Sequence, residues 1–222
     1  MKLHHLRRGA TVAVAGLALS MTLAACGSDD DSSSGSDSSA KSGGSSDSMS
    51  SDAGSQTFGD GCSQVPTSGA GSFDGMVKDP VATAASNNPL LKTLVAAVGS
   101  IDGLADTLNG SEALTVFAPY DGAFAEIPKK DLNALVKGGT EQGQDSTLYK
   151  ILAHHVLGEN DDESAVSGEH DTLAGDTLTI SGDPESGMTV SDGTVTANVL
   201  CGNIPTANAT VYVIDKVLTG VK

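Results

Sequence analysis

The stretch LTVFAPYDGAF, Leu114–Phe124, combines a strand signal with a helix start. Its apolar first half predicts a buried strand that ends at Pro119, because proline cannot continue a strand's hydrogen-bond ladder. Asp121 is then suited to cap a short helical turn that runs through Phe124. We expect the side chains of this corner to be buried, with Phe117 and Phe124 forming an aromatic pair.

Helices are expected before this corner. In SNNPLLKTLVAAVGSI, residues 86–101, apolar residues recur at helical spacing. Asn88 is placed to cap this helix, Pro89 suits its first position, and Gly99 should end it. The segment GLADTL, residues 103–108, predicts a further short helix.

Two more helices are expected after the corner, and then the pattern changes. PKKDLNALVKGG (128–139) and DSTLYKILAHH (145–155) have helical periodicity, with the glycine pair at 138–139 separating them and Asp145 or Ser146 capping the second. The remaining segments are short, rich in β-formers and divided by turn residues. Helices first and strands afterwards, with one early strand, predict an α+β fold.

The segment NATVYVIDKVL, residues 208–218, predicts a closing strand. Because side chains alternate along a strand, its apolar residues should divide between two sides. Val211, Val213 and Val217 should fill the side opposite the corner at Leu114–Phe124, and Ile214 and Leu218 should point elsewhere.

The chain begins with basic residues, an apolar run and small residues, in the order of a secretory signal. The apolar run is too short and too rich in alanine for a membrane-spanning helix. Leu23-Ala24-Ala25-Cys26 resembles a bacterial lipobox, so we predict that residues 1–25 are a lipoprotein signal peptide and that Cys26 carries lipid. An ordinary secretory signal with an incidental cysteine is the alternative. Arg7-Arg8 raises a twin-arginine route, but the neighbouring residues favour general secretion.

Residues 26–61 are mostly Ser, Gly and Asp, and residues 62–222 are long enough for one globular domain. The first segment has too little apolar surface to offset the entropy of ordering, so we predict a disordered, lipid-anchored linker. The second has few aromatic residues and no Trp, so its core should be aliphatic. We expect this domain to be monomeric.

The formal net charge is −16, and removing the leader, with three basic and no acidic residues, makes it −19. Such a chain repels nucleic acid and anionic membrane surfaces. Nucleic acid is therefore excluded as a partner. Lipid on Cys26 would hold the protein at a membrane, and stable anchoring takes two or more acyl chains.

A search for catalytic motifs finds no G-x-S-x-G elbow, phosphate-binding glycine loop or H-E-x-x-H. His154-His155 is the sharpest polar feature, and we expect one of these residues to be buried and the other exposed rather than a metal pair. His170 has no motif partner. The acidic segment Glu159–Ser164 lacks the register of a calcium loop and predicts a solvated loop. We therefore predict no enzyme activity, no metal and no cofactor.

Three stretches together resemble the fasciclin (FAS1) domain: LTVFAPYDGAF, ILAHHV at 151–156, and NATVYVIDKVL. The resemblance covers roughly residues 69–221, and DPVATAASNNPLLKTL narrows it to actinobacterial surface lipoprotein antigens of that family. Tyr120, Asp121 and His154 depart from the family pattern. The resemblance implies structural roles at the motif positions, which are Thr115, Phe117, Pro119, Phe124, His155, Tyr212 and Asp215. It also implies that His155 is the structural histidine and His154 the replaceable one.

Cys62 and Cys201 remain after Cys26 is assigned to lipid. An exported compartment permits disulfides, and the relatives suggested by the resemblance have a similarly placed pair. We predict a bridge, with two free thiols as the alternative.

The resemblance implies a surface-displayed module for adhesion to, or binding of, envelope, matrix or host components through protein or glycan contacts. Such a signature of packing residues carries little chemistry by itself. An extracytoplasmic carrier of a lipid or other apolar ligand is the alternative, and an apolar cavity would favour it.

Overall fold

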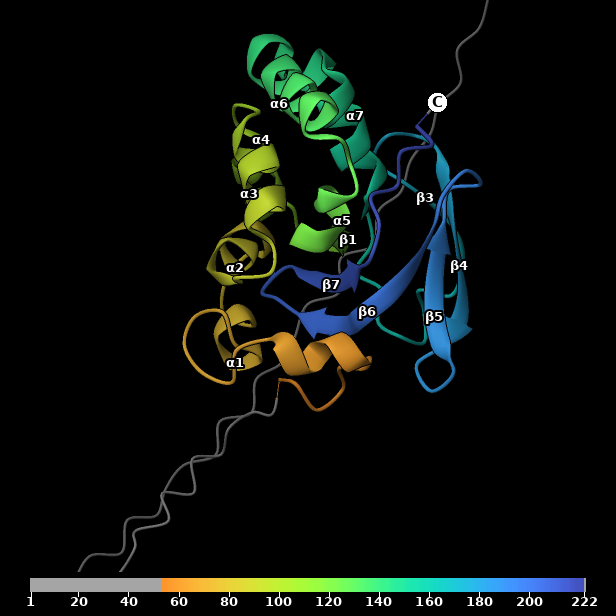
Figure 1. Ribbon diagram of the computed structural model, residues 1–222. Helices are drawn as coiled ribbons and strands as arrows, with labels where there is room; N and C mark the ends of the chain where they lie inside the picture. Colours follow the sequence, from red (N-terminus) through yellow and green to blue (C-terminus); the bar gives the residue numbers. More distant parts are fainter. Residues whose placement is uncertain (1–52, 222) are drawn as a thin grey trace, which may run out of the picture. The chain divides into compact units, whose positions relative to one another are not determined.

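The computed structural model describes residues 53–221 (Figure 1). Helices fill the first part of this range: α1 (Phe73–Met76), α2 (Val81–Asn87), α3 (Lys92–Gly99), α4 (Leu104–Gly110), α5 (Asp121–Ala125), α6 (Lys129–Gln142) and α7 (Thr147–His154). Two 3-10 turns, η1 (Asp60–Gln64) and η2 (Gly143–Asp145), precede α1 and α7. Within residues 53–221, every helix is too short or too polar to cross a membrane.

The strands follow the helices, except for β1. They are β1 (Leu114–Pro119), β2 (Val156–Leu157), β3 (Gly168–Asp171), β4 (Thr177–Asp183), β5 (Gly187–Ser191), β6 (Thr196–Pro205) and β7 (Ala209–Ile214). They form one sheet in the order β2-β1-β7-β6-β5-β4-β3, in which β1 and β7 are parallel and the other neighbours antiparallel. The predicted α+β class is confirmed.

Strands β1 and β7 lie between the helices and the β3–β5 part of the sheet (Figure 1). Strand β6 connects the two parts, and its pairing with β7 shifts register twice between Val199 and Ile204. Asn203 has a φ of 57° at this irregularity. Bulges of this kind bend a strand and increase its twist, which lets β6 belong to both parts.

Two hydrophobic cores result, one on each face of the β1–β7 pair. The closing segment divides between the cores as predicted, with Val211, Val213 and Val217 in the helix-side core and Ile214 and Leu218 in the other. The three valines lie on the same side as Ala118 and Phe124, however, and not opposite this corner as expected. The predicted aromatic pair is wrong: Phe124 belongs to the helix-side core and Phe117 to the other. Alternation along β1 sends Phe117 away from the helices, where its ring centroid lies 5.6 Å from that of Tyr212.

The starts of helices α3 and α5 differ from the predictions. Helix α3 begins at Lys92 rather than Pro89, because the Asn88 side chain accepts a hydrogen bond from the Leu90 N–H at 3.0 Å and holds a turn there. Asp121 begins α5 but does not cap it. Its carboxylate accepts from the Thr93 N–H at 2.7 Å and so caps α3, a helix distant in sequence.

Helix α6 runs through the glycine pair at 138–139 that was predicted to end it. A Cβ on Gly139 would lie 2.8 Å from the Ser100 Oγ and 2.9 Å from the Leu148 Cδ2. This glycine therefore permits close packing rather than a turn. The break falls at Gly143, whose φ is 57°, and Ser146 caps α7 as expected by accepting from the Tyr149 N–H.

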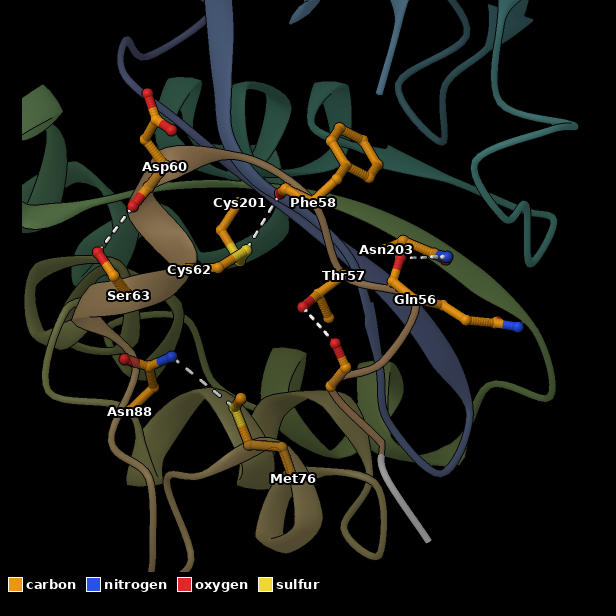
Figure 2. Close-up of a disulfide and its surroundings, with 11 residues drawn as sticks. Gln56, Thr57, Phe58, Asp60, Cys62, Ser63, Met76, Asn88, Cys201 and Asn203 are labelled. Atoms are coloured by element: carbon orange, nitrogen blue, oxygen red, sulfur yellow. Dashed lines mark hydrogen bonds between the residues drawn. A yellow bond between two sulfur atoms is a disulfide. The ribbon is translucent and has the colours of Figure 1, made fainter. Parts of the chain in front are cut away.

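The folded part begins before Cys62, so the expected linker boundary at residue 61 is too late. Phe58 exchanges two backbone hydrogen bonds with Gly202 and packs on the second core. A Cβ on Gly202 would lie 2.3 Å from the Phe58 ring, so only glycine fits beneath it. Disulfide-bonded Cys62 and Cys201 lie beside this contact, with Cα atoms 4.8 Å apart (Figure 2). The predicted signal peptide, Cys26 and most of the linker lie outside the described residues.

Candidate functional site

A cavity of about 340 Å³ lies between α2, α3, α4, α7 and β1. Its walls are mostly aliphatic, and they include Val81, Leu94, Val98, Leu104, Val116 and Leu152. Leu173 also lines it and is 53% exposed. The volume falls within the range of about 300–1,000 Å³ that small-molecule pockets occupy, and such pockets are predominantly apolar. This arrangement is suited to an apolar ligand.

Two asparagine side chains fix the helices that form one wall of the cavity. Asn109 of α4 accepts hydrogen bonds from the N–H groups of Ala82 and Thr83, at 2.9 and 3.3 Å, and so caps α2. Asn208, just before β7, accepts from the Val81 N–H and donates to the Leu108 and Ser111 carbonyls. Because these bonds join the α2 N-terminus to the α4 C-terminus, the wall is held in place without a ligand.

His155 lines the inner side of the cavity, and both nitrogens of its ring make hydrogen bonds within the protein. The Leu218 N–H donates to its Nε2 at 3.0 Å, so the ring proton is on Nδ1, which donates to the Ile151 carbonyl at 2.7 Å. Burial lowers the pKa of His155 to about 4. This histidine is therefore a neutral bridge between α7 and the segment after β7, which agrees with the structural role that the resemblance implied.

His154 is also buried, with 1% of its surface exposed, so the prediction that one histidine of the pair is exposed is wrong. Its Nδ1 lies 2.6 Å from an Asp176 carboxylate oxygen, and its Nε2 lies 3.6 Å from one of Asp192. Helix α7 ends between the two cores, so consecutive side chains enter different environments. Sequence reasoning missed both aspartates, because each is far from His154 in sequence and resembles an ordinary turn residue.

The two aspartates are held by further hydrogen bonds. Burial acts to raise the pKa of Asp176, but hydrogen bonds from Thr172 and His154 outweigh it and hold this pKa below its usual range. Asp192 accepts from the N–H groups of Thr194, Val195 and Gly220. The His154 ring is thus hydrogen-bonded through Asp176 to the turn before β4, and its Nε2, which has no hydrogen-bond partner, lies near Asp192 in the turn after β5.

The remaining motif residues have structural positions. Thr115 of β1 donates from its hydroxyl to the Glu159 carbonyl and accepts from the Asp161 N–H. The Tyr212 hydroxyl donates to the Asp161 carbonyl at 3.1 Å. Asp215 accepts two hydrogen bonds from Asn198 and so fastens the end of β7 to β6. Pro119 ends β1, and Phe124 is buried in the helix-side core.

The acidic segment Glu159–Ser164 was predicted to be a solvated loop, but part of it is buried. Asp161 is only 9% exposed, and its carboxylate lies beside the imidazole of His170. Desolvation by burial raises the pKa of Asp161 despite the opposing effect of His170. The structure therefore brings together two features that the sequence left unconnected.

Comparisons with known proteins identify the family. The sequence model of the fasciclin domain family matches residues 89–220 of this chain. Cell surface glycolipoprotein MPB83 of Mycobacterium bovis is 42% identical over 175 residues, which cover 75% of this chain and 74% of the relative. Immunogenic protein MPB70 of the same species is 41% identical over 168 residues, or 72% and 80% of the two chains. The chain belongs to the fasciclin domain family.

A solved FAS1 domain pair from the insect cell adhesion molecule fasciclin I is also similar. The match has 19% identity and a TM-score of 0.43, and it covers 59% of this chain and 44% of the other.

Proposed function

We propose that this protein is a cell-surface lipoprotein, anchored through Cys26, whose fasciclin domain binds an apolar ligand in the cavity between α2, α3, α4, α7 and β1. The main observation in favour of ligand binding is this cavity of about 340 Å³ with mostly aliphatic walls. The lipobox-like sequence before Cys26 supports surface display, as does the similarity to MPB83, which is named a cell surface glycolipoprotein.

The cavity favours a ligand with an acyl chain or another flexible apolar group. Burying apolar surface contributes about 25 cal/mol per Å², whereas the polar groups at one end, those of Asn109 and Thr83, bond to one another and to the α2 backbone. Few free polar groups remain to select a charged or sugar ligand. Leu173, exposed beside the cavity, adds apolar surface where a ligand chain would leave it.

Adhesion to a protein or glycan partner, which the family resemblance implies, stays a prediction. Surface display would serve adhesion and ligand carriage equally. The cavity is a specific geometric observation, and it favours carriage.

The experiment is a titration of the protein with a fluorescent fatty-acid analogue, together with mass spectrometry of lipid extracted from the purified chain. Ala105, on the cavity wall, is changed to Phe. Filling the cavity should weaken probe binding about tenfold, which corresponds to about 1.4 kcal/mol. Ala134→Phe makes the same change on the exposed side of α6, away from the cavity, and should leave binding unchanged. Equal binding by both variants would refute the cavity as the ligand site.

A further inference from the structure

We propose that Glu159, Asp161 and His170 form a binding site for zinc or a similar divalent transition metal. Glu159 and Asp161 lie in the loop after β2, and His170 lies on β3. One potential ligand atom from each lies within 4.8 Å of the others. The site is distinct from the cavity and does not depend on the proposed function.

One oxygen of the Asp161 carboxylate, Oδ2, has no hydrogen-bond partner. This oxygen is buried, and the residue as a whole is only 9% exposed, so bulk water does not replace the missing hydrogen bond. A buried carboxylate oxygen without a partner is costly and calls for an explanation such as an ion. His170 Nδ1 lies 3.4 Å from this oxygen, which is too long for a good N–H···O hydrogen bond.

The same separation suits two ligands of one zinc ion. Zinc bonds to histidine nitrogen and carboxylate oxygen are about 2.0–2.2 Å long, so tetrahedral ligand atoms lie roughly 3.3–3.5 Å apart. Glu159 is exposed, and one of its carboxylate oxygens lies within 4.8 Å of the other two potential ligand atoms. A water molecule would complete the coordination.

The backbone of this loop is fixed by residues of the central strands. The Thr115 hydroxyl joins the Glu159 carbonyl to the Asp161 N–H, at 2.7 and 2.9 Å. The Tyr212 hydroxyl holds the Asp161 carbonyl. The Asn160 side chain accepts from the Thr210 hydroxyl at 2.7 Å. These bonds hold the two carboxylates near His170 without a metal, and such pre-organisation lowers the cost of binding.

The ligand set favours a transition metal over calcium. Calcium and magnesium take oxygen ligands, whereas imidazole suits zinc, copper and nickel.

The test uses the full chain with Cys26→Ala, so that no free thiol competes for the metal. After treatment with a chelator, zinc is titrated in competition with a chelating dye. His170→Asn and Asp161→Asn should each weaken the site more than about tenfold, because each removes a direct ligand. Glu169→Gln removes one neighbouring charge on β3 and should bind as the parent does.

Melting temperatures separate a metal site from a simple ion pair. Zinc should raise the melting temperature of the parent and of Glu169→Gln, but not that of His170→Asn or Asp161→Asn. Without zinc, Asp161→Asn should be at least as stable as the parent, because it removes a buried charge. A parent that zinc does not stabilise, equal zinc binding by His170→Asn, or a preference for calcium would each overturn the proposal.

Discussion

His154 and His155 are adjacent in the chain but hold different parts of the molecule together. His155 joins α7 to the segment after β7 through two hydrogen bonds of a neutral ring. His154 joins the end of α7 to Asp176 and Asp192 on the other side of the central strands. The two rings meet edge to face, with centroids 6.1 Å apart. One dipeptide therefore connects both halves of the domain.

We predict that His155 makes the free energy of unfolding fall as the pH is lowered. Its folded pKa of about 4 lies below the ordinary 6.5, so the folded state favours the neutral ring. The resulting stability is fully present above pH 6.5 and is lost as pH falls through 4. From pH 7 to pH 4 this residue alone should lower the free energy of unfolding by about 3 kcal/mol. Urea unfolding of the parent and of His155→Gln, at several pH values, measures the difference.

His155→Gln should be less stable at pH 7, because its amide cannot reproduce both bonds, but its stability should fall less steeply with acid. An identical slope in the two proteins would contradict the assignment. Exposed carboxylates are the same in both, so their contribution cancels.

The burial of His154 reverses the effect expected for His154→Tyr. From the resemblance this change should be nearly neutral, but in the structure it removes the imidazole that is hydrogen-bonded to the half-buried Asp176 and lies beside the buried Asp192. We predict a loss of about 2–4 kcal/mol. A double-mutant cycle with Asp176→Asn, followed by thermal melting, measures the coupling. Additive effects of the two changes would show that the pair is not coupled.

Strand β6 is the element that holds the N-terminal segment. Three consecutive residues make these contacts: Cys201 is bonded to Cys62, Gly202 pairs with Phe58, and Asn203 follows them. The Asn203 side chain donates to the Gln56 carbonyl and to Glu163. This one irregular stretch therefore fastens the end of the linker to the domain.

We predict that reduction of Cys62–Cys201 lowers stability and opens residues 57–72 first. The cysteines are 139 residues apart, and a loop of this length corresponds to about 5 kcal/mol in the chain-entropy model. Hydrogen exchange with and without reductant measures the opening, and melting measures the stability. Cys62→Ser/Cys201→Ser should behave as the reduced parent does and should not respond to reductant. Unchanged exchange at Phe58 on reduction would count against this role.

Sequence reasoning found the elements with strong local signals and missed those that depend on distant contacts. The strand at Leu114–Pro119 and the cap at Ser146 follow from apolar runs and local hydrogen bonds. The role of Gly139 depends on how closely α6 approaches Leu148 and Ser100, which no local pattern reveals. The cavity and the site at Asp161 likewise arise from segments that meet only in the folded chain.

At the scale of the whole molecule, an acidic chain follows the predicted signal peptide and the lipobox-like sequence. The net charge of −19 for residues 26–222 opposes binding to anionic membrane surfaces, so the proposed attachment needs another source. Lipid on Cys26 is the proposed source.

We predict that Cys26→Ala releases the protein from the membrane fraction, because residues 26–222 carry a net charge of −19 and offer no electrostatic attraction to an anionic membrane. Detergent phase partitioning of cell fractions measures the change. Cys62→Ala, which leaves the lipobox intact, should remain in the detergent phase. A Cys26→Ala protein that is processed normally and still partitions into detergent would contradict the anchor.

The parallel pairing of β1 with β7 has a consequence for export. Leu114 and its partner Ala209 are 95 residues apart, and the helix-side core also draws on β7. If the chain is exported N-terminus first, as its signal-like start predicts, β1 lacks its partner β7 until nearly the whole chain has emerged. The central strand pair can therefore form only late in translocation.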